Sequence, residues 1–245
     1  MIIANWKCNG NKAMINEWTN NFLSNYIETK KAFIGIAPPS IYIESLLGTK
    51  LNKLEEINIG SQDIDISSGA RTGAISSEMI LDFDCKFSII GHSERRQLFN
   101  ERNDEIKQKI LKIAKKTITI LCIGETLEEN KNELTRDVLK KQLEVVKDIE
   151  LNNSLVIAYE PVWAIGTGNT PTPNNINEIH KFIKDVVQST SDNSAFPLVL
   201  YGGSVNQDNA ESFFKEKFID GALIGGASLD GKKFANIINI FNGTK

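Results

Sequence analysis

Eight short runs of apolar residues, many of them β-branched, recur along the 245-residue chain and constrain its fold more than any other feature. Several runs are apolar from end to end, as expected of strands that are covered on both faces. The pattern therefore predicts eight β-strands. They lie at residues 2–4, 33–37, 57–60, 87–91, 117–123, 154–159, 198–201 and 222–224.

Most intervals between these runs have the periodicity of amphipathic helices. Thr172 and Pro173 supply an N-cap followed by proline at the first helical position. The interval 61–86 is the exception, a polar loop with a short helical stretch near 77–81. Longer helices are predicted over residues 106–114, 134–149 and 176–187.

Strands that alternate with helices are expected to be parallel and joined by right-handed crossovers. A closed (β/α)8 barrel and an open doubly wound sheet both fit this alternation. Eight units in about 245 residues favour the closed α/β barrel. Because no linker rich in proline, glycine or serine divides the sequence, we expect a single domain over residues 1–245.

Composition excludes several classes of function. The 28 basic and 31 acidic residues leave a net charge of −3, unlike the basic balance of proteins that bind nucleic acids. No apolar run approaches the roughly 20 residues of a membrane span, and the N-terminus has no signal-peptide pattern. Cys8, Cys85 and Cys122 fit no zinc motif or disulfide framework. We therefore expect a cytoplasmic protein with reduced thiols, no metal site and no membrane or nucleic-acid partner.

Polar residues follow the ends of most predicted strands, where a barrel carries its chemistry. A lysine within the first strand would need a partner or a ligand. Paired glycines after the last two strands are either tight turns or an anion site built from backbone N–H groups. The second histidine, His180, lies beside an apolar helical stripe and is expected to be structural or solvent-facing. The residues at the strand ends are Asn5, Lys7, His92, Glu160, the turn at 201–204 and the pair Gly225 and Gly226.

Each of these residues also has an ordinary explanation. A lone lysine is usually a solvated surface charge, a lone histidine is more often structural than catalytic, and Glu160 could leave its strand for water. Other catalytic motifs are absent: 166–168 lacks the third glycine of a dinucleotide fingerprint, and there is no P-loop or Gly-x-Ser-x-Gly elbow.

The motifs taken together resemble those of the triosephosphate isomerase family over residues 4–229. That resemblance implies a TIM barrel that interconverts dihydroxyacetone phosphate and D-glyceraldehyde 3-phosphate through an enediolate, in glycolysis and gluconeogenesis, with no cofactor or metal. The matching segments are ANWKCNG at 4–10, GHSERR at 91–96, CIGE at 122–125, AYEPVWAIGTG at 158–168, YGGSV at 201–205 and GGASL at 225–229.

The resemblance also implies the role of each site residue. Glu160 matches the carboxylate base, and His92 matches the neutral histidine that is itself a standard example of pKa tuning. Lys7 would supply positive charge to the enediolate, Asn5 would help to place the substrate, and Glu94 would contribute beside them. Residues 161–168 match a mobile lid. The positions that match the phosphate site are Gly166, Ser204, Gly225 and Gly226.

The loop at 69–74 departs from the family pattern. The family commonly has an aromatic residue at Arg71 and a glutamate at Ala74, and this glutamate pairs with the arginine matching Arg95 of a partner subunit. We still expect a homodimer, formed through the loop around Thr72 and the Cys8 region. Arg95 must then find another acceptor, face water or remain uncompensated, and Ala74→Glu is expected to tighten association.

Two other functions are considered. A catalytically inactive barrel that acts as a binding protein should have lost Asn5, Lys7, His92 or Glu160, and all four are present. A different phosphate-binding barrel isomerase is disfavoured because the histidine and lid motifs both match.

Overall fold

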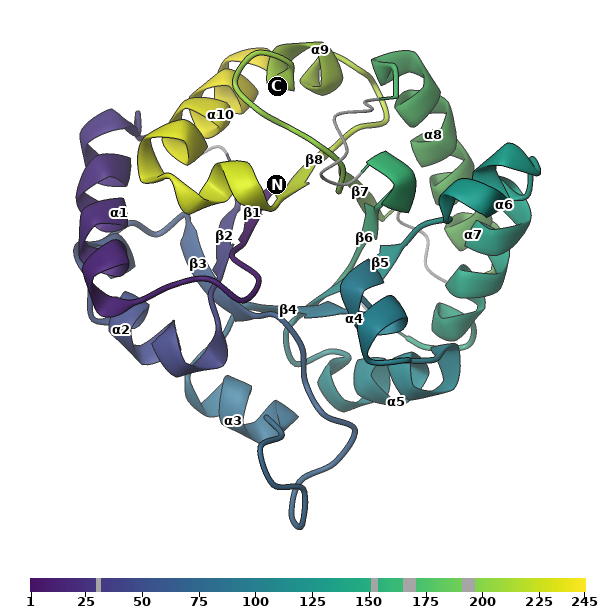
Figure 1. Cartoon of the computed structure of the whole chain (residues 1–245), viewed down its shortest axis with the longest axis horizontal. Coiled ribbons are helices and arrows are strands. Elements are labelled where there is room, and N and C mark those ends of the chain that lie inside the picture. The colour runs from purple at the N-terminus through teal and green to yellow at the C-terminus, as the bar shows by residue number, and fades with distance from the viewer. Residues whose placement is uncertain (30–31, 151–153, 165–170, 191–196) are drawn as a thin grey trace.

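The computed structural model describes residues 1–29, 32–150, 154–164, 171–190 and 197–245. Its eight parallel strands form a closed barrel in sequence order, seen end-on in Figure 1. Pairing of Ile2 with Ala222 joins the first strand to the last, so the open-sheet alternative is wrong. The strands are β1 (Ile2–Asn5), β2 (Ile34–Ala37), β3 (Ile57–Ser61), β4 (Phe87–Ile90), β5 (Ile118–Ile123), β6 (Leu155–Tyr159), β7 (Leu198–Tyr201) and β8 (Gly221–Ile224).

Helices cover the outside of the barrel (Figure 1). Thr172 caps α8 as predicted, since its hydroxyl accepts a hydrogen bond from the Asn175 N–H. The described helices are α1 (Lys12–Asn25), α2 (Ile43–Leu47), α3 (Ser77–Asp82), α4 (Ser93–Leu98), α5 (Asn103–Ile113), α6 (Leu127–Lys131), α7 (Thr135–Leu143), α8 (Pro173–Thr190), α9 (Ala210–Phe214) and α10 (Gly231–Thr244). In the described part of the chain, none of them is long and apolar enough to cross a bilayer.

The helix predicted to run to Ile149 is too long. The α-helix ends at Leu143 and continues only as a 3-10 turn over Glu144–Val146. Asp148 then has φ of 62°, in the left-handed region that a right-handed helix cannot continue through. Apolar periodicity persists because Val145, Val146 and Ile149 are all buried.

Two apolar layers hold the barrel together. One packs the outer faces of the strands against the helices, and the other fills the barrel interior. In the interior, the Phe87 ring of β4 lies against the backbones of Gly60 on β3 and Gly35 on β2. A Cβ atom built on Gly60 would lie 2.6 Å from ring carbons of Phe87, so this close approach requires glycine.

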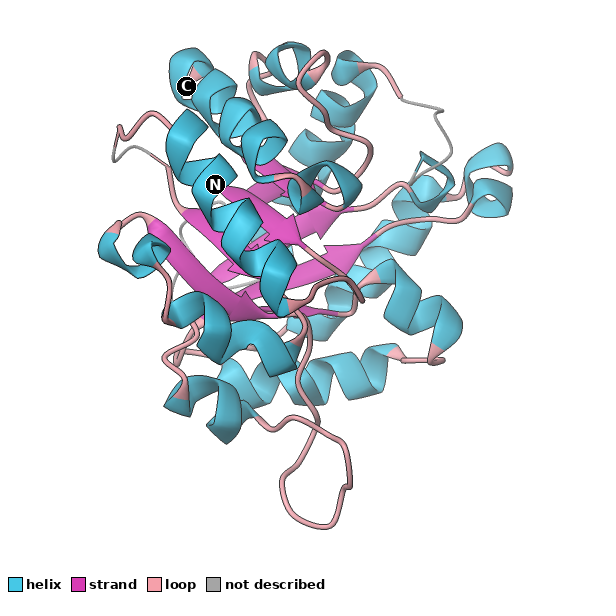
Figure 2. Cartoon of the chain, turned by 60° about the vertical axis from the view of Figure 1, so that its left-hand side comes forward, coloured by secondary structure: helices cyan, strands magenta, loops and turns pink. Residues whose placement is uncertain are grey.

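The segment between β3 and α3 protrudes from the barrel. Figures 1 and 2 show it as a long loop that extends beyond the surrounding helices. Its tip, residues 67–73, is exposed. Within the loop, Arg71 forms an ion pair with Asp65 at 2.5 Å.

Candidate active site

The carboxyl ends of the strands bring most of the predicted residues together around one cavity of about 250 Å3, whereas Glu94 lines only the cavity beside it. Asn5 ends β1, Glu160 follows β6 directly, and His92 lies two residues beyond β4. The sequence predicts Lys7 within the first strand, but Lys7 lies in the loop after that strand, with φ of 51°. The cavity is lined by Asn5, Lys7, His92, Glu160, Gly202, Gly203, Ser204, Val205, Leu223, Gly225, Gly226 and Ala227.

Glu160 and His92 form a buried pair at the edge of this cavity. The Nε2 atom of His92 lies 2.9 Å from Oε1 of Glu160. The other carboxylate oxygen accepts a hydrogen bond from the Ser93 N–H at 3.0 Å, in the first turn of α4. The carboxylate therefore rests at the N-terminus of a helix, where N–H groups favour an anion.

His92 is the N-cap of α4. Its Nδ1 atom accepts a hydrogen bond from the Glu94 N–H at 3.2 Å. Because Nδ1 is an acceptor, the proton of a neutral ring is carried by Nε2, the atom that faces Glu160. The cap thus selects the tautomer that can donate into the cavity.

The two side chains shift each other's pKa. Burial acts to lower the pKa of His92, but the nearby Glu160 carboxylate outweighs it and raises the pKa above its ordinary value. Burial acts to raise the pKa of Glu160, whereas His92 and the Ser93 N–H lower the pKa below its ordinary value. Each shift depends on the partner staying in place, so moving Glu160 away from His92 would reverse both.

Lys7 is held at both its backbone and its side chain. Its carbonyl accepts a hydrogen bond from the Gln62 amide at 2.9 Å, and its N–H donates to the Asn5 side chain at 3.0 Å. The Nζ atom lies 2.6 Å from Oε1 of Glu94. A Cβ atom built on Gly225 would lie 3.4 Å from Cε of Lys7, an ordinary van der Waals contact, so Gly225 and the Lys7 side chain are neighbours.

The predicted phosphate positions lie across the cavity from α4. The Ser204 hydroxyl donates to the Ala164 carbonyl at 3.0 Å, which ties the loop after β7 to the segment after β6. Gly225 and Gly226 open the 3-10 turn Gly226–Leu229. Gly166 and the rest of the predicted lid beyond Ala164 lie outside the described residues.

Two glycines shape the backbone around Glu160. A Cβ atom on Gly124 would collide with the Glu160 carbonyl, and one on Gly202 would lie 2.7 Å from the Glu160 Cγ atom. In the sequence Gly124 is only part of a motif, and no sequence signal shows which backbone or side chain a glycine faces.

Glu125 is a buried carboxylate that the sequence did not single out. It accepts hydrogen bonds from the Tyr159 hydroxyl at 3.1 Å and from the Trp163 indole N–H at 2.8 Å. Asn130 also donates to it at 3.2 Å. Glu125 therefore fixes the first residues of the predicted lid to β5, and its place in the CIGE segment was the available signal.

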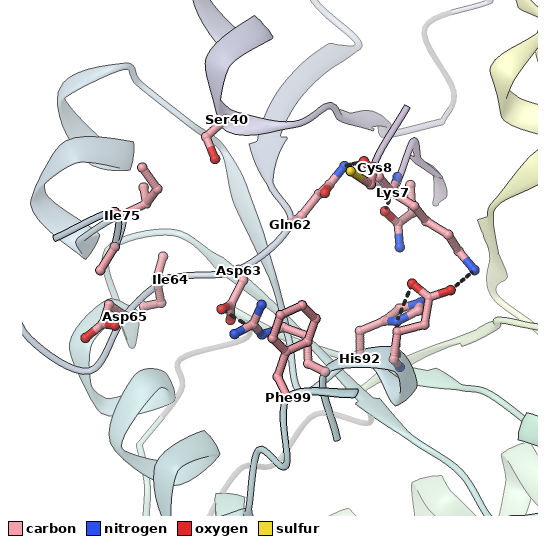
Figure 3. Close-up of a pocket in the computed structure, with 15 residues that line it drawn as sticks. Lys7, Cys8, Ser40, Gln62, Asp63, Ile64, Asp65, Ile75, His92 and Phe99 are labelled. Carbon is pink, nitrogen blue, oxygen red and sulfur yellow. Dashed lines mark hydrogen bonds and ion pairs between the residues drawn. The ribbon is translucent and has the colours of Figure 1, made fainter. Parts of the chain in front are cut away.

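A second cavity of about 360 Å3 adjoins the first and shares Asn5, Lys7 and His92 with it. Figure 3 shows Lys7, Gln62 and His92 around it, with Cys8 beside Lys7. Phe99 and Ala74 also line it. This second cavity opens beside the protruding loop rather than toward the phosphate positions.

The acceptor that Arg95 needs is within its own chain. Its Nε atom lies 2.8 Å from Asp63 and 2.7 Å from Glu101. The sequence left open whether Arg95 finds another acceptor, faces water or stays uncompensated, and the structure settles this.

A closed parallel barrel with acid–base side chains at the carboxyl ends of its strands places this chain among the (β/α)8-barrel enzymes. Comparison with known proteins narrows that class. The sequence model of the family described as triosephosphate isomerase matches residues 1–241.

Whole-length relatives bear the same name. The triosephosphate isomerase of Legionella pneumophila (strain Paris) is 40% identical and aligns over 99% of this chain and 98% of its own length. The triosephosphate isomerase of Klebsiella pneumoniae is 38% identical and aligns over 100% of this chain and 98% of its own length. The chain therefore belongs to the triosephosphate isomerase family, as its sequence motifs suggested.

Proposed function

We propose that Glu160 is the base with which this chain interconverts dihydroxyacetone phosphate and D-glyceraldehyde 3-phosphate. The reaction removes a proton from the carbon next to a carbonyl and returns it to the adjacent carbon. A carboxylate on one side of the substrate and hydrogen-bond donors aimed at its oxygens are the groups that this chemistry needs. The observation that carries the proposal is the Glu160–His92 pair, 2.9 Å apart at the edge of the cavity.

In the described state Glu160 is turned toward His92 and α4. To reach a substrate carbon, the carboxylate must leave the His92 ring and the Ser93 N–H. Burial is then opposed only by the weaker effects of Glu94 on His92 and of Lys7 on Glu160, so the pKa of Glu160 rises and that of His92 falls. The same movement makes the base stronger and the imidazole neutral.

His92 then donates from Nε2 to the substrate carbonyl oxygen. The Glu94 N–H holds Nδ1 as an acceptor, so the ring stays in the required tautomer. As the enediolate forms, negative charge grows on that oxygen, and a single donor placed for it is worth about 10²–10³-fold in rate. The ring then takes the hydroxyl proton from the neighbouring oxygen, which restores the neutral imidazole, and the proton that Glu160 took from one carbon returns to the next, which completes the isomerisation.

Lys7 supplies the fixed positive charge, and Glu94 holds its ammonium group at the cavity. Asn5 anchors the Lys7 backbone and lines the cavity beside it. We assign the phosphate to Ser204, Gly225 and Gly226, whose backbones are unshielded by large side chains. Gly166 completes this set on the strength of its motif alone.

We also propose that the protein is a cytoplasmic homodimer. The second cavity is unfilled by the chain's own loop, and apolar side chains near it face outward: Ile41 is 79% exposed, Leu98 72% and Phe99 66%. Exposed apolar groups around a concavity favour a partner surface. The protruding loop around Thr72 of a second copy is the occupant that we assign, beside Cys8.

A coupled assay with glyceraldehyde 3-phosphate tests the activity. The parent should turn it over, whereas glyceraldehyde without the phosphate should react very poorly because remote binding energy is lost. A barrel that binds the substrate but gives no turnover would favour the binding-protein alternative. Sedimentation over a dilution series tests the dimer, and a protein that is monomeric at micromolar concentration while fully active would exclude it.

A further inference from the structure

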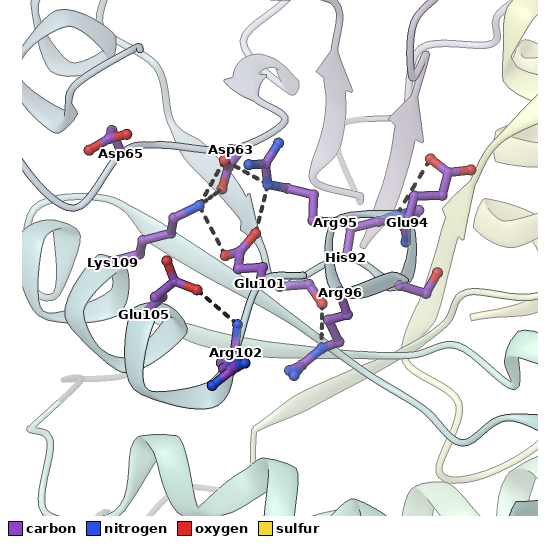
Figure 4. A network of polar contacts seen from close by, with 12 residues as sticks. Asp63, Asp65, His92, Glu94, Arg95, Arg96, Glu101, Arg102, Glu105 and Lys109 are labelled. Atoms are coloured by element: carbon purple, nitrogen blue, oxygen red, sulfur yellow. Dashed lines mark hydrogen bonds and ion pairs between the residues drawn. The ribbon is translucent and has the colours of Figure 1, made fainter. Parts of the chain in front are cut away.

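Four charged side chains form a closed ring beside the candidate active site (Figure 4). Arg95 contacts Asp63 at 2.8 Å and Glu101 at 2.7 Å. Lys109 contacts the same two acids, Asp63 at 2.7 Å and Glu101 at 2.9 Å. Two acids and two bases alternate around the ring, so their formal charges cancel.

The ring joins three parts of the fold. Asp63 lies two residues after β3, Arg95 lies in α4, and Glu101 precedes α5, which carries Lys109. Glu101 and Lys109 are buried, and the Asp63 side chain is 20% exposed. Interactions at this depth are screened by water much less than surface pairs are. The exit of β3 is therefore tied to α4, the helix that His92 caps.

The sequence neighbours of the Asp63–Arg95 pair hold Lys7. Gln62, next to Asp63, donates its amide to the Lys7 carbonyl. Glu94, next to Arg95, binds the Lys7 ammonium group. The ion pair between Asp63 and Arg95 therefore sets the distance between Gln62 and Glu94, the two side chains that bind Lys7.

We propose that Asp63 is a positioning residue for the reaction, which fixes the first turn of α4 relative to Lys7 through its ion pair with Arg95. The inference rests on the roles proposed above for Lys7 and His92. It means that α4 is anchored by an acid of the same chain, with no carboxylate required from a second copy. Burial raises the pKa of Asp63 to about 6, against the pull of Lys109 and Arg95, so the acid is mainly ionised at neutral pH.

Asp63→Asn tests the proposal, because it keeps the shape of the side chain and removes its charge. At 25 °C and pH 7.5 we expect kcat/KM to fall about fivefold or more, mainly through kcat, since small displacements of catalytic groups are costly. Asp84→Asn is the matched control. It removes an exposed acid whose partner is Lys86, away from the ring and from both cavities, and it should change kcat/KM by less than about twofold.

A double variant separates positioning from charge balance. Asp63→Asn with Lys109→Met removes one acid and one base, so the ring stays neutral and Arg95 keeps Glu101. We expect thermal stability to recover toward that of the parent while kcat stays low. Recovery of kcat together with stability would show that the ring only balances charge and would overturn the proposal.

Two further outcomes are decisive. A folded Asp63→Asn variant with parental kcat and KM would also overturn the inference, whereas an inactive parent would overturn the proposed function instead. If Asp63→Asn alone does not fold, the charge-balanced double variant provides the same comparison of kcat.

Discussion

Gly60→Ala should destabilise the barrel from inside. A Cβ atom at Gly60 would lie 2.6 Å from three carbons of the Phe87 ring, which is roughly 1 Å closer than ordinary contact. The ring cannot retreat freely, because a Cβ built on Gly35 would also lie 2.7 Å from it. Overpacking of this kind costs about 1–3 kcal/mol. We expect that loss in the free energy of unfolding, measured by urea denaturation at 25 °C.

Gly243→Ala is the matched control. No described atom outside its own helix and chain neighbours lies within 4 Å of a Cβ at Gly243 in α10, so alanine there should be neutral or stabilising by up to about 1 kcal/mol. Phe87→Leu should relieve the clash, so the cost of combining it with Gly60→Ala should be less than the sum of the two single costs. A Gly60→Ala cost under about 0.5 kcal/mol, or strictly additive costs, would refute the packing argument.

Three further predictions concern charge. Lys7→Met should lower both kcat and the affinity for a phosphate-bearing substrate analogue, because the ammonium group interacts with the substrate dianion and then with the enediolate. Steady-state kinetics and inhibitor titration check this. An unchanged kcat together with an unchanged affinity would contradict it. Ala74→Glu should change the dimer Kd by less than about threefold, because Arg95 already has two carboxylates and a third adds repulsion of similar size to its attraction. Sedimentation measures the Kd, and tightening by tenfold or more would restore the expectation drawn from the sequence. Burial lowers the pKa of His180 to about 3, so below pH 6.5 the unfolded chain takes up a proton that the folded chain does not. The stability that neutral His180 contributes is then lost as pH falls, by about 1 kcal/mol per pH unit. The difference in unfolding free energy between the parent and His180→Phe should follow that slope from pH 6.5 to 4, and a flat difference would contradict it.

The strands were predictable because a strand that is buried on both faces has a continuous apolar sequence. Each of the eight was placed to within about two residues, and the closure of the barrel followed from their number. Helix ends were less predictable. The apolar spacing around Val145 and Ile149 continues past Leu143, although the backbone at Asp148 no longer supports a helix.

Positions within the site were partly predictable. Residues at strand ends were found because a barrel gathers them at one face, which is how His92 and Glu160 come within 2.9 Å. Lys7 was misplaced within a strand, since a short polar turn and a strand end look alike in sequence. Glu125 was not singled out as a hydrogen-bond acceptor.

Pairwise contacts between distant residues could not be predicted. Arg95, Asp63 and Lys109 come from separate elements, and hydrophobic periodicity carries no information on which charges meet. The same holds for His180, whose full burial against Tyr159 and the Phe218 carbonyl depends on tertiary packing.

The most direct test of proton transfer by Glu160 is the rate at which Glu160→Gln catalyses deuterium incorporation into the substrate. Dihydroxyacetone phosphate is incubated with enzyme in D2O, and incorporation of deuterium next to the carbonyl is followed by NMR together with isomerisation. With the parent, we predict rapid exchange and turnover. Glu160→Gln should lose both by about 10²–10⁴-fold while it still binds a phosphate-bearing inhibitor, because the fold and the anion site are unchanged. A variant that retains more than about a tenth of the parent's exchange rate would show that another group is the base.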